Sequence, residues 1–298
     1  MKLVCTDLDR TLLPNGEQLE SAHARPILWH LLRTHDVQLA YVSGRDLARV
    51  LDAIDEYSLP IPDAIVADVG TSVYSLHAGE WVQNQDWLAK ISQDWKGMVS
   101  SDVQNLLSGV TWLTEQEPDR QSTYKQSYYF DWETDLAKML IQVSSVLDAQ
   151  GIRSSLVSSL DPEKNIGLLD VLPHSATKRE AVAFLQSLFN VASEQTLFAG
   201  DSGNDVNAIC ARHPSVLVAN ADASTRDAVE QACNEDVSLR ESICMATGDL
   251  AVSGEASLNG HYAAGIVEGL VHFRPGWCDN LNDSQWVQQA RKPTNKTT

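Results

Sequence analysis

Apolar residues gather in short runs that alternate with amphipathic stretches near the start of the chain. Three of these runs are short, rich in β-branched residues and bounded by polar positions, which predicts buried strands: KLVCT, VQLAYVS and DAIVADVG. The two stretches between them repeat apolar residues at helical spacing: QLESAHARPILWHLLRTH and DLARVLDAIDEY. Strands that alternate with helices in this way indicate βαβ units and a parallel sheet.

The same alternation returns in the last third of the chain. The expected helices are KREAVAFLQSLFN, DVNAICARH and STRDAVEQAC, and the expected strands between them are QTLFAG and SVLVAN. The two halves together predict an α/β fold, with a Rossmann-like parallel sheet as its core and helices on both faces.

The middle of the chain has a different pattern. Helical periodicity is expected around residues 86–108 and 133–150, and the stretches VTWLTEQE and STYKQSYYFDW between them are aromatic and β-like. This pattern predicts a smaller α+β domain inserted into the α/β core. We therefore expect the core to comprise residues 1–84 and 168–298 and the insertion to comprise residues 85–167. The final stretch, RKPTNKTT, is expected to be a disordered tail.

Composition and charge narrow the class of protein. The chain has 298 residues, 43% of them apolar and 21% charged, which is ordinary for a soluble globular protein. A net charge of -18 argues against nucleic-acid binding, which needs a basic surface. The sequence contains no apolar run of about 18 residues, so no membrane span is expected. Five scattered cysteines without a CxxC pair indicate free thiols, and the start of the chain does not resemble a signal peptide, so we expect a cytoplasmic protein.

Acidic residues stand at the ends of two predicted strands. Asp7 and Asp9 follow the first strand, and Asp201 and Asp205 follow QTLFAG. Ligands of open parallel sheets bind beyond the carboxyl ends of the strands. There, one carboxylate could attack phosphorus, a second could move protons, and others could bind Mg²⁺. On these residues alone, polar turns with aspartate caps remain an alternative.

Two further stretches could hold an anion. In YVSGRD, a hydroxyl at Ser43 and a glycine at position 44, which permits a close backbone approach, precede a predicted helix, whose N-terminus can bind phosphate. A simple helix cap by Asp46 explains this stretch as well. In HSATKREA, a capping box at the helix start would place Lys178 in the first turn, where a cation opposes the helix dipole. An anion in front of Lys178 would offset that cost, although a solvated surface lysine remains the alternative.

The four motifs, taken in order, resemble those of the haloacid dehalogenase superfamily of phosphohydrolases. They are Asp-x-Asp-x-Thr, Ser-Gly-Arg, a lysine, and Gly-Asp-Ser-Gly-Asn-Asp. The insertion between the second motif and the lysine resembles the type-two cap of the sugar-phosphatase branch. Four stretches resemble sucrose-phosphate phosphatases and the matching domain of bacterial sucrose-phosphate synthases: DVLPHSATKREAVAFL, GDSGNDVNAI, VANAD and HYAAGIVEGLVHF. Ser43 is a departure, since the family usually carries threonine there, but the hydroxyl is kept.

This resemblance implies a role for each motif residue. Asp7 would be the nucleophile, and Asp9 would be the general acid and then the general base. Phosphoryl oxygens would be held by residues of the second, third and fourth motifs: Ser43, Gly44, Lys178 and Asn204. Mg²⁺ would be held by the carboxylates and one backbone carbonyl of the first and last motifs: Asp7, Asp9 (carbonyl), Asp201 and Asp205.

The cap is implied to recognise the sugar. Lys125 and Tyr129 would share one face of a strand and contact the substrate, while Arg45 and Asn220 would reach it from the core. The alternative for the cap tyrosines is that they only pack the cap's sheet against its helices.

The expected function is a Mg²⁺-dependent phosphatase that forms an aspartyl-phosphate and acts on a sugar phosphate. Sucrose 6-phosphate is the first expectation, with a sucrose-phosphate synthase as an expected partner. Alternatives are a phosphatase for mannosylfructose phosphate or a glycosylglycerate phosphate, a mutase, or a non-catalytic sugar-phosphate-binding domain. A mutase is disfavoured because the cap is expected after the second motif, and a dehalogenase is disfavoured because it needs no second acid such as Asp9.

Overall fold

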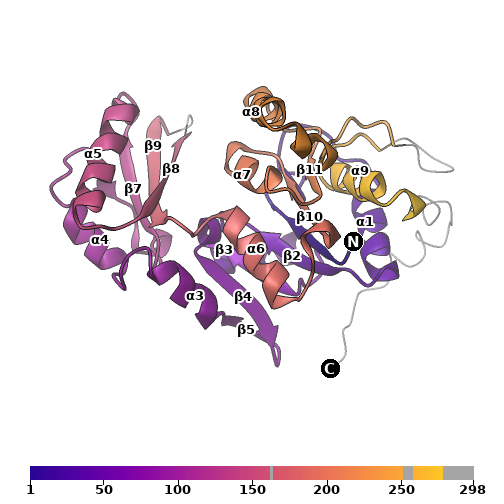
Figure 1. The fold of residues 1–298 in the computed structure, drawn as a ribbon, viewed down its shortest axis with the longest axis horizontal. Helices are drawn as coiled ribbons and strands as arrows, with labels where there is room; N and C mark the ends of the chain where they lie inside the picture. The colour runs from indigo at the N-terminus through magenta and orange to yellow at the C-terminus, as the bar shows by residue number, and fades with distance from the viewer. Residues whose placement is uncertain (162–163, 251–257, 278–298) are drawn as a thin grey trace.

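The computed structural model describes residues 1–161, 164–250 and 258–277, which form a large and a small domain (Figure 1). The predicted tail and Cys278 lie outside these residues, whereas Cys5, Cys210, Cys233 and Cys244 are free thiols. Among the described helices, none is long and apolar enough to cross a bilayer.

The large domain is built on a mixed sheet with the strand order β12-β11-β10-β1-β2-β3-β4-β5. Six neighbouring strands are parallel: β1 (Leu3–Thr6), β2 (Gln38–Val42), β3 (Ala64–Ala67), β10 (Thr196–Gly200), β11 (Ser215–Leu217) and β12 (Ile243–Met245). An antiparallel hairpin, β4 (Ser72–His77) and β5 (Glu80–Gln83), completes one edge. The α/β prediction is therefore confirmed, although the hairpin was not predicted.

Helices cover both faces of this sheet (Figure 1). Their apolar sides enter two buried clusters, one on each face, as the helical spacing in the sequence requires. One face is covered by α1 (Ala24–Thr34), α2 (Leu47–Glu56) and α9 (Ala263–Phe273). The other face is covered by α3 (Gln85–Ser92), α6 (Lys178–Leu188), α7 (Val206–Ile209) and α8 (Ala223–Glu235). Short 3₁₀ turns connect these elements: η1 (Asp68–Gly70), η3 (Ser193–Gln195), η4 (Gly203–Asp205) and η5 (Val237–Glu241).

The small domain has its own antiparallel sheet in the order β6-β7-β9-β8. Its elements are β6 (Thr114–Glu115), β7 (Gln126–Asp131), β8 (Ser154–Asp161), β9 (Ile166–Pro173), η2 (Pro118–Arg120), α4 (Ser100–Leu107) and α5 (Leu136–Ala149). Tyr128 and Phe130 of β7 pack in a separate core with the two α-helices. Alternation along the strand therefore turns Ser127 and Tyr129 to the other face of the sheet.

The limits of the inserted domain remain a proposal, and the structure bears on where to place them. Trp87 and Ile91 of α3 are buried against the large sheet, so this helix packs with the core. At the other end, β9 continues in the small sheet to Pro173, beyond the expected limit at residue 167.

The continuous helical pattern expected around residues 86–108 is broken in the structure. Two helices, α3 and α4, take its place, and the chain turns between them at Lys96 and Gly97. Both residues have positive φ, 52° and 80°, which an α-helix cannot accommodate. Gly97 adopts this conformation at little cost because it has no Cβ.

Candidate active site

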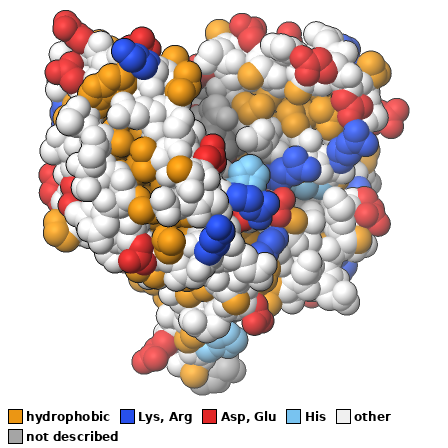
Figure 2. Space-filling model, turned by 60° about the vertical axis from the view of Figure 1, so that its left-hand side comes forward, with side chains coloured by type: hydrophobic (Ala, Val, Ile, Leu, Met, Phe, Trp, Pro, Cys, Tyr) orange, Lys and Arg blue, Asp and Glu red, His pale blue; other side chains and the backbone are white. Residues whose placement is uncertain are grey.

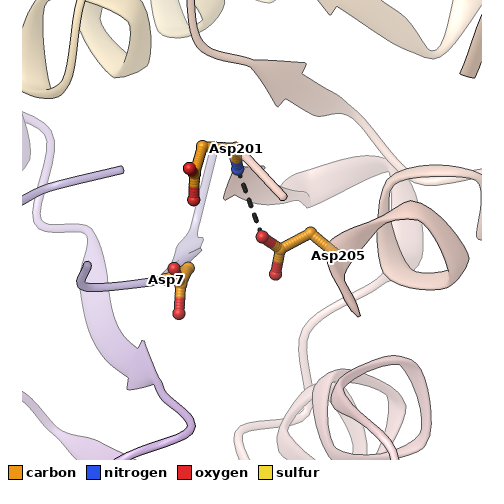
Figure 3. Close-up of side chains that lie close together, drawn as sticks. All are labelled: Asp7, Asp201 and Asp205. Atoms are coloured by element: carbon orange, nitrogen blue, oxygen red, sulfur yellow. Dashed lines mark hydrogen bonds between the residues drawn. The ribbon is translucent and has the colours of Figure 1, made fainter. Parts of the chain in front are cut away.

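Two neighbouring strand ends bring the first pair of carboxylates together. Strands β1 and β10 are parallel neighbours, and Thr6 pairs in register with Ala199. Asp7 follows β1 and Asp201 follows β10, so both lie at the same edge of the sheet. The Asp7 N–H extends the strand pairing by donating to the Ala199 carbonyl at 2.9 Å. Figure 3 shows the two side chains beside each other, together with Asp205.

Asp205 is held in place by the turn that follows β10. Its carboxylate accepts hydrogen bonds from the backbone N–H groups of Asp201, at 3.1 Å, and Ser202, at 3.2 Å. This close approach requires glycine at position 200, since a Cβ there would lie 2.5 Å from the Asp205 Cβ. A Cβ at Gly203 would meet no atom within 4 Å, so only the first of these two glycines is required by packing.

Lys178 reaches this acidic cluster from the first turn of α6. Thr177 caps the helix by accepting the Glu180 N–H at 3.2 Å, as the sequence predicts. The Lys178 ammonium lies 2.8 Å from Asp7 Oδ1 and 2.6 Å from Asp205 Oδ1, and its side chain is buried. Burial by itself lowers the pKa of Lys178, but the carboxylates of Asp205 and Asp7 outweigh this and raise the pKa above its ordinary value. Both effects of the carboxylates favour the charged form of Lys178 within the site.

The three carboxylates carry more negative charge than Lys178 can balance. One ligand atom from each of Asp7, Asp201 and Asp205 lies within 4.8 Å of the others, and all three residues are buried. Burial raises the pKa of Asp7 to about 7 despite the opposing effect of Lys178, and burial together with the Asp205 charge raises the pKa of Asp201 to about 6. Such a cluster favours an added cation, and its oxygen ligands suit Mg²⁺. The residues present thus fit the metal that the sequence predicts.

Two residues of the first motif support this cluster, although the sequence analysis assigned neither of them a role. The Thr11 hydroxyl donates a hydrogen bond of 3.0 Å to Asp201 Oδ1, and Arg10 Nε lies 3.5 Å from Asp201 Oδ2. Thr11 is the threonine of the Asp-x-Asp-x-Thr pattern, and that pattern could have predicted its place beside the acidic cluster.

Asp9 is more exposed than Asp7 and belongs to a different set of contacts. Its side chain is 41% exposed, and Arg45 donates hydrogen bonds to both of its carboxylate oxygens, at 2.8 and 2.6 Å. The Asn15 amide donates a third, at 2.6 Å. The hydrogen bond to Asp9 raises the pKa of Arg45. Arg45, which was expected to contact the substrate, therefore meets the predicted acid–base residue.

The second motif lies at the end of β2. Ser43 is buried, and its hydroxyl accepts the Arg45 N–H at 3.1 Å. Gly44 is exposed, and a Cβ there would meet no atom closer than Val69 Cγ2, at 4.0 Å. Asp46 caps α2 by accepting the Arg49 N–H at 2.8 Å. The structure thus leaves the Gly44 backbone accessible at a strand end.

The remaining predicted binding residues lie apart from the carboxylate cluster or support it indirectly. Asn204 is exposed and accepts the Ser202 hydroxyl at 3.1 Å. The Asn220 amide donates to the Arg10 carbonyl at 2.5 Å and its oxygen accepts the Tyr262 N–H at 2.9 Å, so it joins two loops.

Two predicted substrate residues come from the small domain. Lys125 is buried, with its ammonium 3.6 Å from Asp68 of the large domain. The Tyr129 hydroxyl donates to Glu117 at 2.8 Å on the surface. The sequence analysis did not predict a role for Asp68, because nothing in DAIVADVG marks it as a partner for a distant lysine.

Comparison with known proteins places this site in a family. The family model described as sucrose-6F-phosphate phosphohydrolase matches residues 1–274. The chain belongs to the sucrose-phosphate phosphatase family. A crystal structure of the sucrose-phosphatase from Synechocystis, in complex with sucrose and phosphate, matches this family member with a TM-score of 0.68 and 25% identity, over 92% of this chain and 98% of that one.

Curated relatives agree with the assignment. This sucrose-phosphatase family member is 42% identical to a HAD-like hydrolase of Nitrosococcus oceani, over 97% of this chain and 75% of the relative. It is 30% identical to the mannosylfructose-phosphate phosphatase of Agrobacterium fabrum, over 69% of this chain and 77% of that protein. The chain is thus a sugar-phosphatase-like hydrolase of the haloacid dehalogenase type.

Proposed function

We propose that this protein is a Mg²⁺-dependent phosphatase that hydrolyses sucrose 6-phosphate through an aspartyl-phosphate on Asp7. The observation that carries the proposal is the position of the Asp7 carboxylate. It lies at a strand end, 2.8 Å from the Lys178 ammonium, and in one cluster with Asp201 and Asp205. This arrangement supports a role for Asp7 as the nucleophile, with a phosphoryl group bound in front of it by Lys178.

In the first step, an Asp7 oxygen attacks phosphorus while the bond from phosphorus to the sugar oxygen breaks. Asp9 donates a proton to the departing sugar oxygen. In the second step, Asp9 takes a proton from water as the water oxygen attacks phosphorus. The bond between Asp7 and phosphorus then breaks, which releases phosphate and restores the carboxylate. The exposure of Asp9 supports this role, since the sugar and the water must both reach it.

Positive charge is needed at the phosphoryl group during both steps. Lys178 supplies one fixed cation, and the Ser43 hydroxyl and the Gly44 backbone are the proposed hydrogen-bond donors. Mg²⁺, when bound, supplies further positive charge to the phosphoryl oxygens. Its proposed ligands are Asp7, the Asp9 carbonyl, Asp201 and Asp205, and Asn204 remains a proposed phosphate contact.

We assign selection of the sugar to the small domain, which is the proposed cap. We expect the large domain to contact mainly the phosphoryl group and its linking oxygen, so most of the discrimination between sugars would fall to the cap. A site that hydrogen-bonds hydroxyl groups rejects ligands without them, because its own polar groups are then left unpaired. Tyr129, with its exposed hydroxyl, remains a proposed sugar contact, and Arg45, Lys125 and Asn220 remain proposed substrate residues.

Mannosylfructose phosphate is the second candidate substrate, because the 30% identical relative carries that activity in its name. A panel assay decides between the two. Phosphate release would be measured, with and without Mg²⁺, from sucrose 6-phosphate, mannosylfructose phosphate, a glucosylglycerate phosphate and p-nitrophenyl phosphate. We expect the highest kcat/KM for sucrose 6-phosphate. A higher value for another sugar phosphate would make that compound the assigned substrate. No phosphate release from any of them would favour a non-catalytic binding domain.

A further inference from the structure

One largely buried ion pair joins the cap to the large domain. The Lys125 ammonium, just before β7, lies 3.6 Å from Asp68 Oδ1 in η1, and the two side chains are only 10% and 9% exposed. A second ion pair also joins the two domains, from Arg49 of α2 to Asp119 of the cap at 3.2 Å, but its side chains are 38% and 66% exposed. Figure 2 shows basic and acidic side chains intermixed on the face where the two domains meet.

The backbone that carries Asp68 is held in an uncommon conformation. Asp68, Val69 and Gly70 all have positive φ, at 53°, 60° and 104°, and only glycine adopts such values freely. Hydrogen bonds fix the turn, because the Thr71 hydroxyl donates to the Asp68 carbonyl at 3.0 Å and the Ser72 hydroxyl donates to Asp68 Oδ2 at 3.3 Å. The carboxylate is therefore presented to the cap from a rigid support.

The same turn contacts the segment of Arg45, which holds Asp9, and the start of α6, which carries Lys178. The Asp68 N–H donates to the Arg45 carbonyl at 2.8 Å, and the Arg45 side chain holds Asp9. A Cβ added at Gly70 would lie 3.0 Å from the carbonyl carbon of Thr177, the residue before Lys178. Asp68 thus connects the cap to the elements that position Asp9 and Lys178.

We propose that Asp68 is a positioning residue, which holds the cap closed over the site through Lys125. Removing one member of a buried pair leaves the other charge buried without a partner, which penalises the closed state. The exposed pair between Arg49 and Asp119 has water as an alternative partner, so its loss should matter little. The proposal rests on the proposed function only in taking cap closure as a step of sugar-phosphate turnover.

A distance measurement tests the proposal without using activity. Spin labels would be attached at Ile141→Cys on α5 of the cap and at Leu188→Cys on α6 of the large domain, both exposed positions. The background would carry serine at Cys210, Cys233 and Cys278. The distance between the two labels would be compared in four proteins. One keeps the native ion pair, and the others carry Asp68→Asn, Lys125→Met or the matched control Asp119→Asn. Asparagine tolerates positive φ, so Asp68→Asn should keep the turn.

We expect one short distance in the unsubstituted protein and in Asp119→Asn. Asp68→Asn and Lys125→Met should each add a longer-distance population, and the double variant should show no more of it than the single variants. If Asp68→Asn is poorly folded, Lys125→Met tests the same pair from the cap. Unchanged distances in the folded variants, or an equal change in Asp119→Asn, would overturn the proposal.

Kinetics give a second readout that a purely structural role would not produce. Asp68→Asn should lower kcat/KM for the preferred sugar phosphate by ~10-fold, because only part of the population is closed, while p-nitrophenyl phosphate, which needs no cap contact, changes little. Equal losses on both substrates would contradict the positioning role. If the unsubstituted protein hydrolyses no sugar phosphate, the proposed function fails, while the distances still decide whether the pair closes the cap.

Discussion

Arg45 holds the Asp9 carboxylate with both arms of its guanidinium, Nε to Oδ2 at 2.8 Å and Nη2 to Oδ1 at 2.6 Å. Two parallel hydrogen bonds fix the plane of a carboxylate as well as its position. Asp9 is the proposed acid and base, so Arg45, together with the Asn15 amide, would fix the carboxylate that delivers the proton. This geometry favours a role for Arg45 in orienting Asp9 over a direct contact with the substrate.

Arg45→Lys should therefore damage catalysis with every substrate. Lysine keeps the charge but cannot form the paired hydrogen bonds, so Asp9 loses its fixed orientation. We expect kcat to fall ~10-fold, about 1.4 kcal/mol in barrier, with sucrose 6-phosphate and with p-nitrophenyl phosphate alike. Steady-state kinetics on both substrates would check this, with Arg49→Lys, in the first turn of α2, as the control. A loss confined to the sugar phosphate would instead identify Arg45 as a substrate contact.

Gly200→Ala should be far more harmful than Gly203→Ala. The added methyl at position 200 would lie 2.5 Å from the Asp205 Cβ, whereas the methyl at position 203 meets open space. Overpacking of this kind costs ~1–3 kcal/mol in stability and would displace Asp205 from Lys178. Urea unfolding and Mg²⁺-dependent phosphatase activity measure the two effects. Similar behaviour of the two variants would show that the turn adapts and that the close approach is not required.

The stability of the metal-free protein should fall as pH rises, and Mg²⁺ should reverse the trend. In the folded state the pKa values of Asp7 and Asp201 are raised to about 7 and about 6, compared with ~4 in an unfolded chain. The folded state thus retains protons that the unfolded chain has released. The resulting stabilisation is complete below pH ~4 and is lost as the pH rises through 6 and 7.

Mg²⁺ binds the deprotonated carboxylates, so it should stabilise the protein more at high pH. Thermal melting in EDTA and in Mg²⁺, at pH 5.5 and pH 8, would show the larger increase in Tm at pH 8. A Mg²⁺ concentration 100 times the Kd corresponds to ~2.7 kcal/mol. Asp201→Asn is the matched control, and its response to Mg²⁺ should be smaller at both pH values. An equal increase in Tm at both pH values in the unsubstituted protein would contradict the assignment of these ligands.

The sequence predicted the parts of the site that depend on strand ends and helix starts. Asp7 and Asp201 follow buried strands, and parallel neighbours place such residues at one edge without further information. Lys178 followed from the capping box at Thr177, which fixes where the helix begins. In each case the local pattern determines the position of the side chain.

The rest depends on contacts between segments far apart in sequence. Lys125 and Asp68 are joined only because the cap folds against the large domain, and no local pattern encodes that distance. Arg45 meets Asp9 for a similar reason, across the end of the sheet. The break at Lys96 and Gly97 was missed because the apolar periodicity continues on both sides of the turn.

The central claim is that Asp7 is the nucleophile of a Mg²⁺-dependent sucrose-phosphatase. Its most direct test is phosphate release from sucrose 6-phosphate by the unsubstituted protein and by Asp7→Asn, each with Mg²⁺ and with EDTA. An amide cannot form the acyl-phosphate, so we expect release only from the unsubstituted protein with Mg²⁺, and a loss of at least ~10³-fold in Asp7→Asn. Turnover by folded Asp7→Asn at the unsubstituted rate, or full activity in EDTA, would contradict the account.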